Sequence, residues 1–253
     1  MILTHRDGPI LRVELARPEK KNAITRSMYQ ALSDALVQAD EDRGVRVVVL
    51  HGAPGVFTAG NDLGDFLENP PRDPTSPVFR FLQAIAHFGK PLVAAVSGPA
   101  VGIGTTMLLH CDFVFAADDA KFSLPFVMLA LCPEAASSYL LPRVAGYQRA
   151  AELLMLGEPF PATRAKECGI VTEVVPAASL LEKALATARK LAERPPASLR
   201  ITKALMRRAL LAGIEQALAS EQVEFGARLN SPEAREAFAA FFERRPADFS
   251  KFD

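Results

Sequence analysis

Two short apolar runs that each lead into a glycine-bearing loop constrain the fold of this chain most strongly. Residues 45–50 precede the loop at residues 55–65. Residues 91–96 precede a glycine-rich turn, after which we expect a helix from Gly102. Apolar runs of this length, bounded by glycine, are typical of buried strands. A helical pattern at residues 78–87 lies between them, and strands that alternate with helices predict an α/β fold.

The N-terminal segments carry clear local signals. Residues 1–15 predict two short strands joined near Gly8, because Asp-Gly is a favourable hairpin turn. Thr25 can cap a helix that runs to about Asp42. The other predicted segments are strands at residues 113–116 and 121–123 and an exposed, mobile, proline-rich loop at residues 69–77.

The C-terminal part reads differently from the rest of the chain. After Val175 the pattern is helical almost throughout, with a break at residues 194–197, which include two prolines. We therefore predict an α/β core at residues 1–195 and a C-terminal helical region at residues 196–253. The three aromatic residues Phe238, Phe241 and Phe242 are interpreted as core or as a subunit interface, where buried aromatics are enriched.

Composition excludes several classes of partner. Lys and Arg together number 29 and so do Asp and Glu, which gives no reason to expect nucleic acid or an anionic membrane surface as a partner. No apolar run approaches the roughly 20 residues of a membrane span. The first residues do not resemble a signal peptide, and the chain does not end in a peroxisomal Ser-Lys-Leu signal. The three cysteines fit a reducing compartment, so we expect a cytoplasmic protein.

Glu134 is the one carboxylate in an otherwise apolar and small-residue stretch at residues 129–139. Loss of hydration favours the neutral form of such an acid and raises its pKa, which suits general acid–base catalysis near neutral pH. Taken alone, the stretch leaves another interpretation open, because most carboxylates beside a proline are solvated or cap a helix. Cys132 has no neighbouring base to activate it, so we interpret it as an inert thiol.

The two glycine-bearing loops could serve a ligand. Gly60 lets the chain turn and lets a ligand approach the backbone. The first amides of a helix starting near Gly102 lack intrahelical acceptors and suit a developing oxyanion. The Gly-Ile-Gly sequence lacks the further glycine and the acidic partner of a dinucleotide site. His110, Cys111 and Asp112 are adjacent in sequence and cannot converge on one ion, so no metal site is expected, and Asp62 is interpreted as stabilising its turn.

These segments, in this order and spacing, resemble the crotonase superfamily, which is also called the enoyl-CoA hydratase/isomerase family. Residues 15–24 resemble its first coenzyme A loop, residues 57–63 its first oxyanion loop, residues 98–112 its second, and residues 231–246 its closing helix. The resemblance covers essentially the whole chain. It implies a spiral of ββα units, an acyl-CoA site in the core, and a C-terminal helical region that forms a homotrimer or a hexamer.

Within that family the sequence is most similar to the peroxisomal type of Δ3,Δ2-enoyl-CoA isomerase. Residues 133–139 and 59–63 carry this likeness, which implies that Glu134 is the single proton shuttle. The two positions of the hydratase glutamates are occupied here by Thr106 and Phe126. Both hydratase acids are therefore absent.

The resemblance also assigns the remaining site residues. The oxyanion donors would be the backbone N–H groups of Asn61 and Ile103. Ile103 departs from the glycine that is common there, and a β-branched residue disfavours positive φ and narrows the pocket. The residues expected to contact the coenzyme A thioester are Lys20, Lys21, Ala23, Ala59, Gly60, Asn61, Asp62 and Leu63. The thioester is the substrate, and no permanently bound cofactor is implied.

The resemblance thus implies an isomerase that moves a double bond through a thioester dienolate, in fatty acid metabolism. Two alternatives stay open. One is a different reaction of the same family, such as hydration or thioester hydrolysis. The other is a catalytically silent acyl-CoA-binding scaffold.

Overall fold

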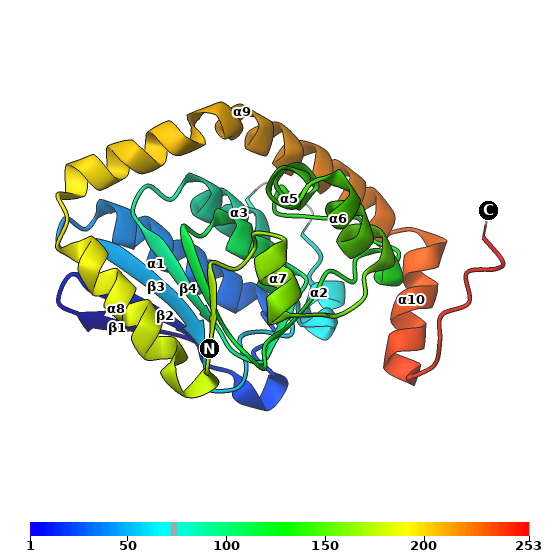
Figure 1. The fold of residues 1–253 in the computed structure, drawn as a ribbon. Helices are drawn as coiled ribbons and strands as arrows, with labels where there is room; N and C mark the ends of the chain where they lie inside the picture. Colours follow the sequence, from blue (N-terminus) through cyan, green and yellow to red (C-terminus); the bar gives the residue numbers. More distant parts are fainter. Residues whose placement is uncertain (72–74, 253) are drawn as a thin grey trace.

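The computed structural model describes residues 1–71 and 75–252, so part of the proline-rich stretch predicted as a mobile loop lies outside the described residues. Its centre is a six-stranded sheet with the order β1-β2-β3-β4-β6-β9 (Figure 1). The first pair is the predicted antiparallel hairpin, and all later neighbours are parallel. The strands are β1 (Ile2–Asp7), β2 (Ile10–Leu15), β3 (Val47–Gly52), β4 (Leu92–Val96), β6 (Phe113–Ala117) and β9 (Glu173–Val175).

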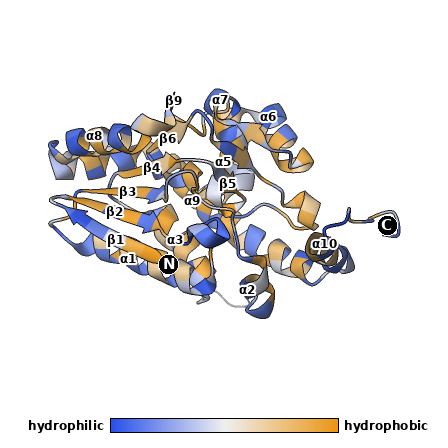
Figure 2. Cartoon of the chain, turned by 90° about the horizontal axis from the view of Figure 1, so that it is seen from below, coloured by the Kyte–Doolittle hydropathy of each residue, from blue (hydrophilic) through white to orange (hydrophobic). Residues whose placement is uncertain are grey.

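Helices cover both faces of this sheet. α1 (Arg26–Glu41) and α3 (Pro77–His87) pack together on one side, and α8 (Leu180–Ala192) lies on the other (Figures 1 and 2). Covered strands of this kind are apolar along their whole length. Val47, Val48 and Val49 accordingly have no exposed surface.

A smaller sheet includes part of the second glycine-bearing loop. It contains β5 (Pro99–Val101), β7 (Lys121–Ser123) and β8 (Phe160–Pro161) in the order β5-β7-β8. The rings of Phe122 and Phe160 stack at a centroid distance of 5.8 Å across β7 and β8. This sheet fixes the strand that leads into the short helix α4 (Ile103–Thr106).

The C-terminal helices lie apart from the large sheet. α9 (Pro196–Leu229) arches over the molecule, and α10 (Pro232–Glu243) stands at the end away from the sheet (Figure 1). α9 passes over α5 (Ser137–Ala145), with Ile214, Leu218 and Phe225 buried beneath it. α9 starts at the boundary expected after residue 195, and the division into two regions stays a prediction.

Most local signals are confirmed. Thr25 caps α1 by accepting a hydrogen bond from the Met28 N–H at 3.3 Å. The helix expected from Gly102 is only one turn long, and a 3₁₀ turn follows it. The remaining elements are η1 (Pro18–Lys20), α2 (Leu63–Glu68), η2 (Met107–His110), η3 (Val127–Leu129), α6 (Tyr147–Ala151), the π-helical turn η4 (Glu152–Leu156), α7 (Ala162–Glu167) and η5 (Ala177–Ser179). Within residues 1–71 and 75–252, no helix has the length and apolarity needed to cross a bilayer.

Candidate active site

Glu134 lies in the loop between η3 and α5, where 7% of its surface is exposed. The Thr106 hydroxyl donates a hydrogen bond to its Oε1 at 3.0 Å. Burial raises the pKa of Glu134 from its ordinary value of 4.5 to about 8, against the opposing effect of the Thr106 hydrogen bond, and the nearby carboxylate of Glu221 adds to the rise. The carboxyl can therefore both accept and return a proton near neutral pH.

The two glycine-bearing loops are hydrogen-bonded to each other. The Thr58 N–H donates to the Pro99 carbonyl at 2.9 Å, and the Val101 N–H donates to the Thr58 carbonyl at 3.1 Å. Gly60 adopts a φ of 87°, and a Cβ added there would lie 2.8 Å from the Val101 carbonyl oxygen. Glycine is therefore required for this close approach.

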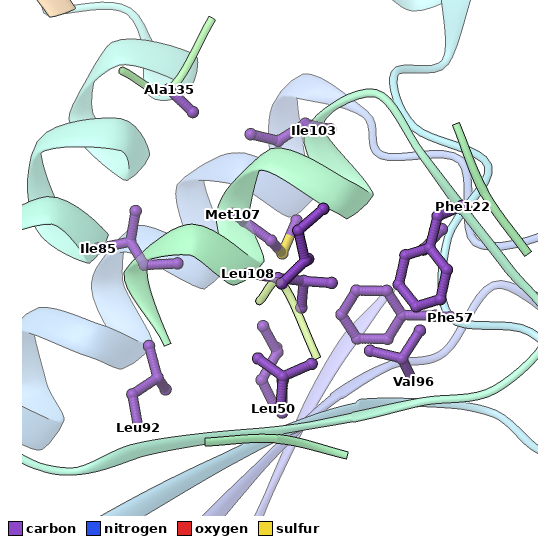
Figure 3. Packing of buried hydrophobic residues seen from close by; sticks show 14 of the residues in the cluster. Leu50, Phe57, Ile85, Leu92, Val96, Ile103, Met107, Leu108, Phe122 and Ala135 are labelled. Atoms are coloured by element: carbon purple, nitrogen blue, oxygen red, sulfur yellow. The ribbon is translucent and has the colours of Figure 1, made fainter. Parts of the chain in front are cut away.

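Both amides expected to form the oxyanion hole are free to bind a ligand. Within the described part of the chain, the N–H groups of Asn61 and Ile103 donate to no protein acceptor, whereas the Gly102 N–H donates to the Ser123 carbonyl at 2.9 Å. The strain expected at Ile103 is absent, because the positive φ of 54° falls on Gly102. The Ile103 side chain is buried with Met107 and Leu108 in the core (Figure 3).

These loops border a cavity of about 540 Å³. Every residue that we expected to contact the thioester lines this cavity except Lys21. Lys21 is exposed and follows Lys20 directly in the chain. α10 contributes Ala237, Ala240, Phe241 and Phe242 to the lining. Phe238 is buried as expected, but Phe241 and Phe242 are more than half exposed at the rim of the cavity rather than in the core.

Glu134 does not line this cavity but a neighbouring one of about 20 Å³. Phe66 and Phe225 line both cavities, and their rings meet edge to face at 6.0 Å. The two rings are therefore part of the wall between the large cavity, which the two glycine-bearing loops border, and Glu134. Phe225 comes from α9, and no pattern in the sequence predicted that this helix reaches the site.

Comparison with known proteins decides the family. A sequence profile described as enoyl-CoA hydratase/isomerase matches residues 5–251. The chain belongs to the enoyl-CoA hydratase/isomerase family. Its crotonase fold, expected from the motifs, is confirmed by OdaA of Pseudomonas aeruginosa, which is 45% identical and superposes with a TM-score of 0.93 over 96% of this chain and 99% of that one.

Members of the family with different printed activities are similar to this chain. Enoyl-CoA delta isomerase 2 of Rattus norvegicus is 37% identical over 97% of this chain. This chain spans only 64% of the length of that relative. The 2,3-dehydroadipyl-CoA hydratase of Escherichia coli (strain K12) is 32% identical, with 98% of each chain covered. Similarity alone therefore fixes the family and not the reaction.

The two positions that the resemblance assigns to hydratase glutamates hold no carboxylate. Thr106 is fully buried and bonded to Glu134, and Phe126 is 5% exposed and lines the large cavity. Sequence reasoning placed Thr106 at a lost acid position but did not anticipate its hydrogen bond to Glu134. The one hint that Thr106 lies near the site is that it belongs to the same short helix as Ile103.

Three further contacts hold the first glycine-bearing loop. The Tyr29 hydroxyl donates to Asn61 Oδ1 at 2.5 Å, and burial, reinforced by the negative charge of Glu134, raises the pKa of Tyr29. Asp62 caps α2 by accepting from the Asp65 N–H at 3.2 Å, and it pairs with Arg17 at 2.6 Å. Asp62 therefore stabilises its turn, as expected, while also lining the cavity.

The residues interpreted as structural are placed accordingly. His110 shares a hydrogen bond with the Ala135 carbonyl at 2.8 Å, while Asp112 pairs with Lys203 at 2.8 Å. Among the residues that the structure describes, no group of His, Cys, Asp and Glu is arranged to hold a metal ion. Burial raises the pKa of Cys132 to about 11, which keeps it a thiol. The homotrimer or hexamer stays a prediction.

Proposed function

We propose that this protein is a Δ3,Δ2-enoyl-CoA isomerase. Glu134 takes a proton from C2 of a 3-enoyl thioester, which leaves a dienolate with the charge on the thioester oxygen. Glu134 then returns the proton to C4, and the double bond lies between C2 and C3. The observation that carries this proposal is the buried carboxyl of Glu134, whose pKa is raised to about 8, together with Thr106 and Phe126 at the two hydratase positions.

The chemistry needs only one such group. Hydration requires a positioned water and a separate proton donor, for which paired carboxylates are suited. Isomerisation moves one proton over two carbons, so one base with reach to both suffices. A carboxyl with a pKa near the working pH serves best in both directions, because it must be a base first and an acid second.

The N–H groups of Asn61 and Ile103 would stabilise the dienolate oxygen. Preorganised backbone donors act where the charge develops, and the loss of one donor in related acyl chemistry costs on the order of 100- to 1000-fold in rate. The support for this role is that neither amide donates to an acceptor among the described residues, and that the two loops are hydrogen-bonded to each other. The thioester would lie along the 540 Å³ cavity, with Lys20 on its lining and Lys21 exposed nearby for the coenzyme A phosphates.

Hydration is the second candidate function, because another buried carboxyl, Glu221, also lines the small cavity with Glu134. Both oxygens of Glu221 already accept backbone N–H bonds, from Ala136 at 2.6 Å and from Ser138 at 2.9 Å. A carboxyl occupied in this way is a poor base for water. We therefore expect hydration of a 2-enoyl-CoA to be orders of magnitude slower than isomerisation.

The test is an assay of purified protein with a 3-enoyl-CoA, followed by the absorbance of the conjugated 2-enoyl thioester. Glu134→Gln keeps the shape of the side chain but removes proton acceptance, so kcat should fall by about 100-fold or more. Coenzyme A binding should persist, which serves as the control for folding. A variant that keeps more than about a tenth of kcat would exclude Glu134 as the shuttle. A silent wild-type protein that still binds coenzyme A would favour a scaffold.

A further inference from the structure

The loop that carries Glu134 has an unfavourable backbone conformation. The two residues after it, Ala135 and Ala136, have φ values of 59° and 55°. Both are fully buried. Residues with a Cβ avoid this left-handed region, and two in succession persist only where surrounding contacts hold them. Some other part of the molecule must therefore fix this loop.

Glu221, in the last third of α9, makes contacts that fix this loop. Its Oε2 accepts from the Ala136 N–H at 2.6 Å, and its Oε1 accepts from the Ser138 N–H at 2.9 Å and the Ser138 hydroxyl at 2.5 Å. Glu221 is 7% exposed and lies on the buried face of α9 between Leu218 and Phe225. Three hydrogen bonds from one buried side chain span the turn that follows Glu134.

We propose that Glu221 is a positioning residue for Glu134: it holds the Ala135–Ala136 turn so that the Glu134 carboxyl stays hydrogen-bonded to Thr106. The proposal rests on the proposed role of Glu134 as proton shuttle. It makes the reaction depend on α9, which also lines the small cavity with Leu218, Gln222 and Phe225.

A carboxylate suits this task better than its amide. All three groups that bond to Glu221 are donors, and the two backbone N–H groups cannot act as acceptors. Glutamine has one acceptor oxygen, so its amide group would face one of these backbone donors. Glu221→Gln should therefore release one side of the turn and misplace Glu134 while the helix itself remains. A misplacement of about 1 Å in a catalytic group can cost about 100-fold in rate.

The experiment compares Glu221→Gln with Glu224→Gln, which removes the same charge from an exposed site one turn further along α9. Glu221→Gln should lower kcat by about 10- to 100-fold, with KM and coenzyme A binding within about 2-fold of the wild type. Glu224→Gln should leave both constants unchanged. A folded Glu221→Gln protein with a kcat within about 3-fold of the wild type would overturn the proposal.

Two further measurements keep the outcome decisive. If Glu221→Gln does not fold, Ser138→Ala removes one of the three bonds and should lower kcat several-fold at constant KM, and an unchanged kcat would refute the positioning role.

Crystal structures separate this proposal from the proposed function. If the wild type shows no isomerase activity, the function fails, whereas the positioning role still predicts that Glu221→Gln breaks the 3.0 Å contact between Glu134 and Thr106. An undisturbed Glu134 in that variant would overturn it.

Discussion

The buried carboxyl of Glu134 should make the stability of this protein fall as the pH rises. In the folded state Glu134 keeps its proton up to about pH 8. In the unfolded chain Glu134 releases this proton near pH 4.5, the ordinary pKa of its carboxyl. The folded state thus binds more protons between these values, and the free energy of unfolding decreases with increasing pH. Glutamine at this position has the same shape and does not titrate. Each pKa unit of difference is worth about 1.36 kcal/mol, so Glu134→Gln should gain about 3 kcal/mol over the wild type between about pH 5 and pH 8.

Urea unfolding of both proteins at about pH 5 and about pH 8 measures this gain. A constant cost of the new amide group enters equally at both values of pH and cancels from the comparison. Glu224→Gln, an exposed carboxyl on α9, is the matched control and should show no comparable gain. A stability difference between Glu134→Gln and wild type that does not change with pH would refute the raised pKa, and with it the argument that Glu134 is poised as both base and acid.

Three substitutions test the surroundings of the carboxyl and the oxyanion loops. Thr106→Val removes the hydrogen bond that favours ionised Glu134, so the rise of kcat with pH should move to higher pH by about one unit, as a pH profile would show. Gly60→Ala places a Cβ 2.8 Å from the Val101 carbonyl oxygen and should lower kcat by about 100-fold by parting the two loops, with coenzyme A binding as the control. Ile103→Pro deletes a donor amide at a helix position that tolerates proline and should lower kcat by about 100-fold or more, whereas Ile103→Val should be nearly normal; a folded, active proline variant would show that another amide binds the oxyanion.

The features that the sequence predicted are local ones. The hairpin at Gly8, the Thr25 cap and the buried strand at β3 each depend on residues close together in the chain. The isolation of Glu134 is also local, because its neighbours are apolar or small, and its burial agrees with that. The conformation of Gly102 shows the limit of this reasoning, since the residue that carries the positive φ is a neighbour of the one expected to bear the strain.

The features that the sequence did not predict come from distant segments. Glu221 looks like any glutamate of a long, mostly exposed helix, and only the path of α9 over α5 brings it to the Glu134 loop. Phe225 and Phe241 reach the cavity in the same way, from helices whose periodicity does not reveal which face meets the core. Hydrophobic spacing predicts that a helix has a buried side and gives no information about what that side contacts.

A single-turnover isotope experiment tests the central claim, that one carboxyl moves the proton, most directly. A 3-enoyl-CoA with two deuterium atoms at C2 is converted in ordinary water, and the 2-enoyl product is analysed for deuterium at C4. Because Glu134 is 7% exposed, its exchange with solvent should be slow enough for part of the deuterium taken from C2 to reappear at C4. A product whose new C4 hydrogen comes entirely from water would contradict a single buried shuttle and would point to separate groups for removal and return of the proton.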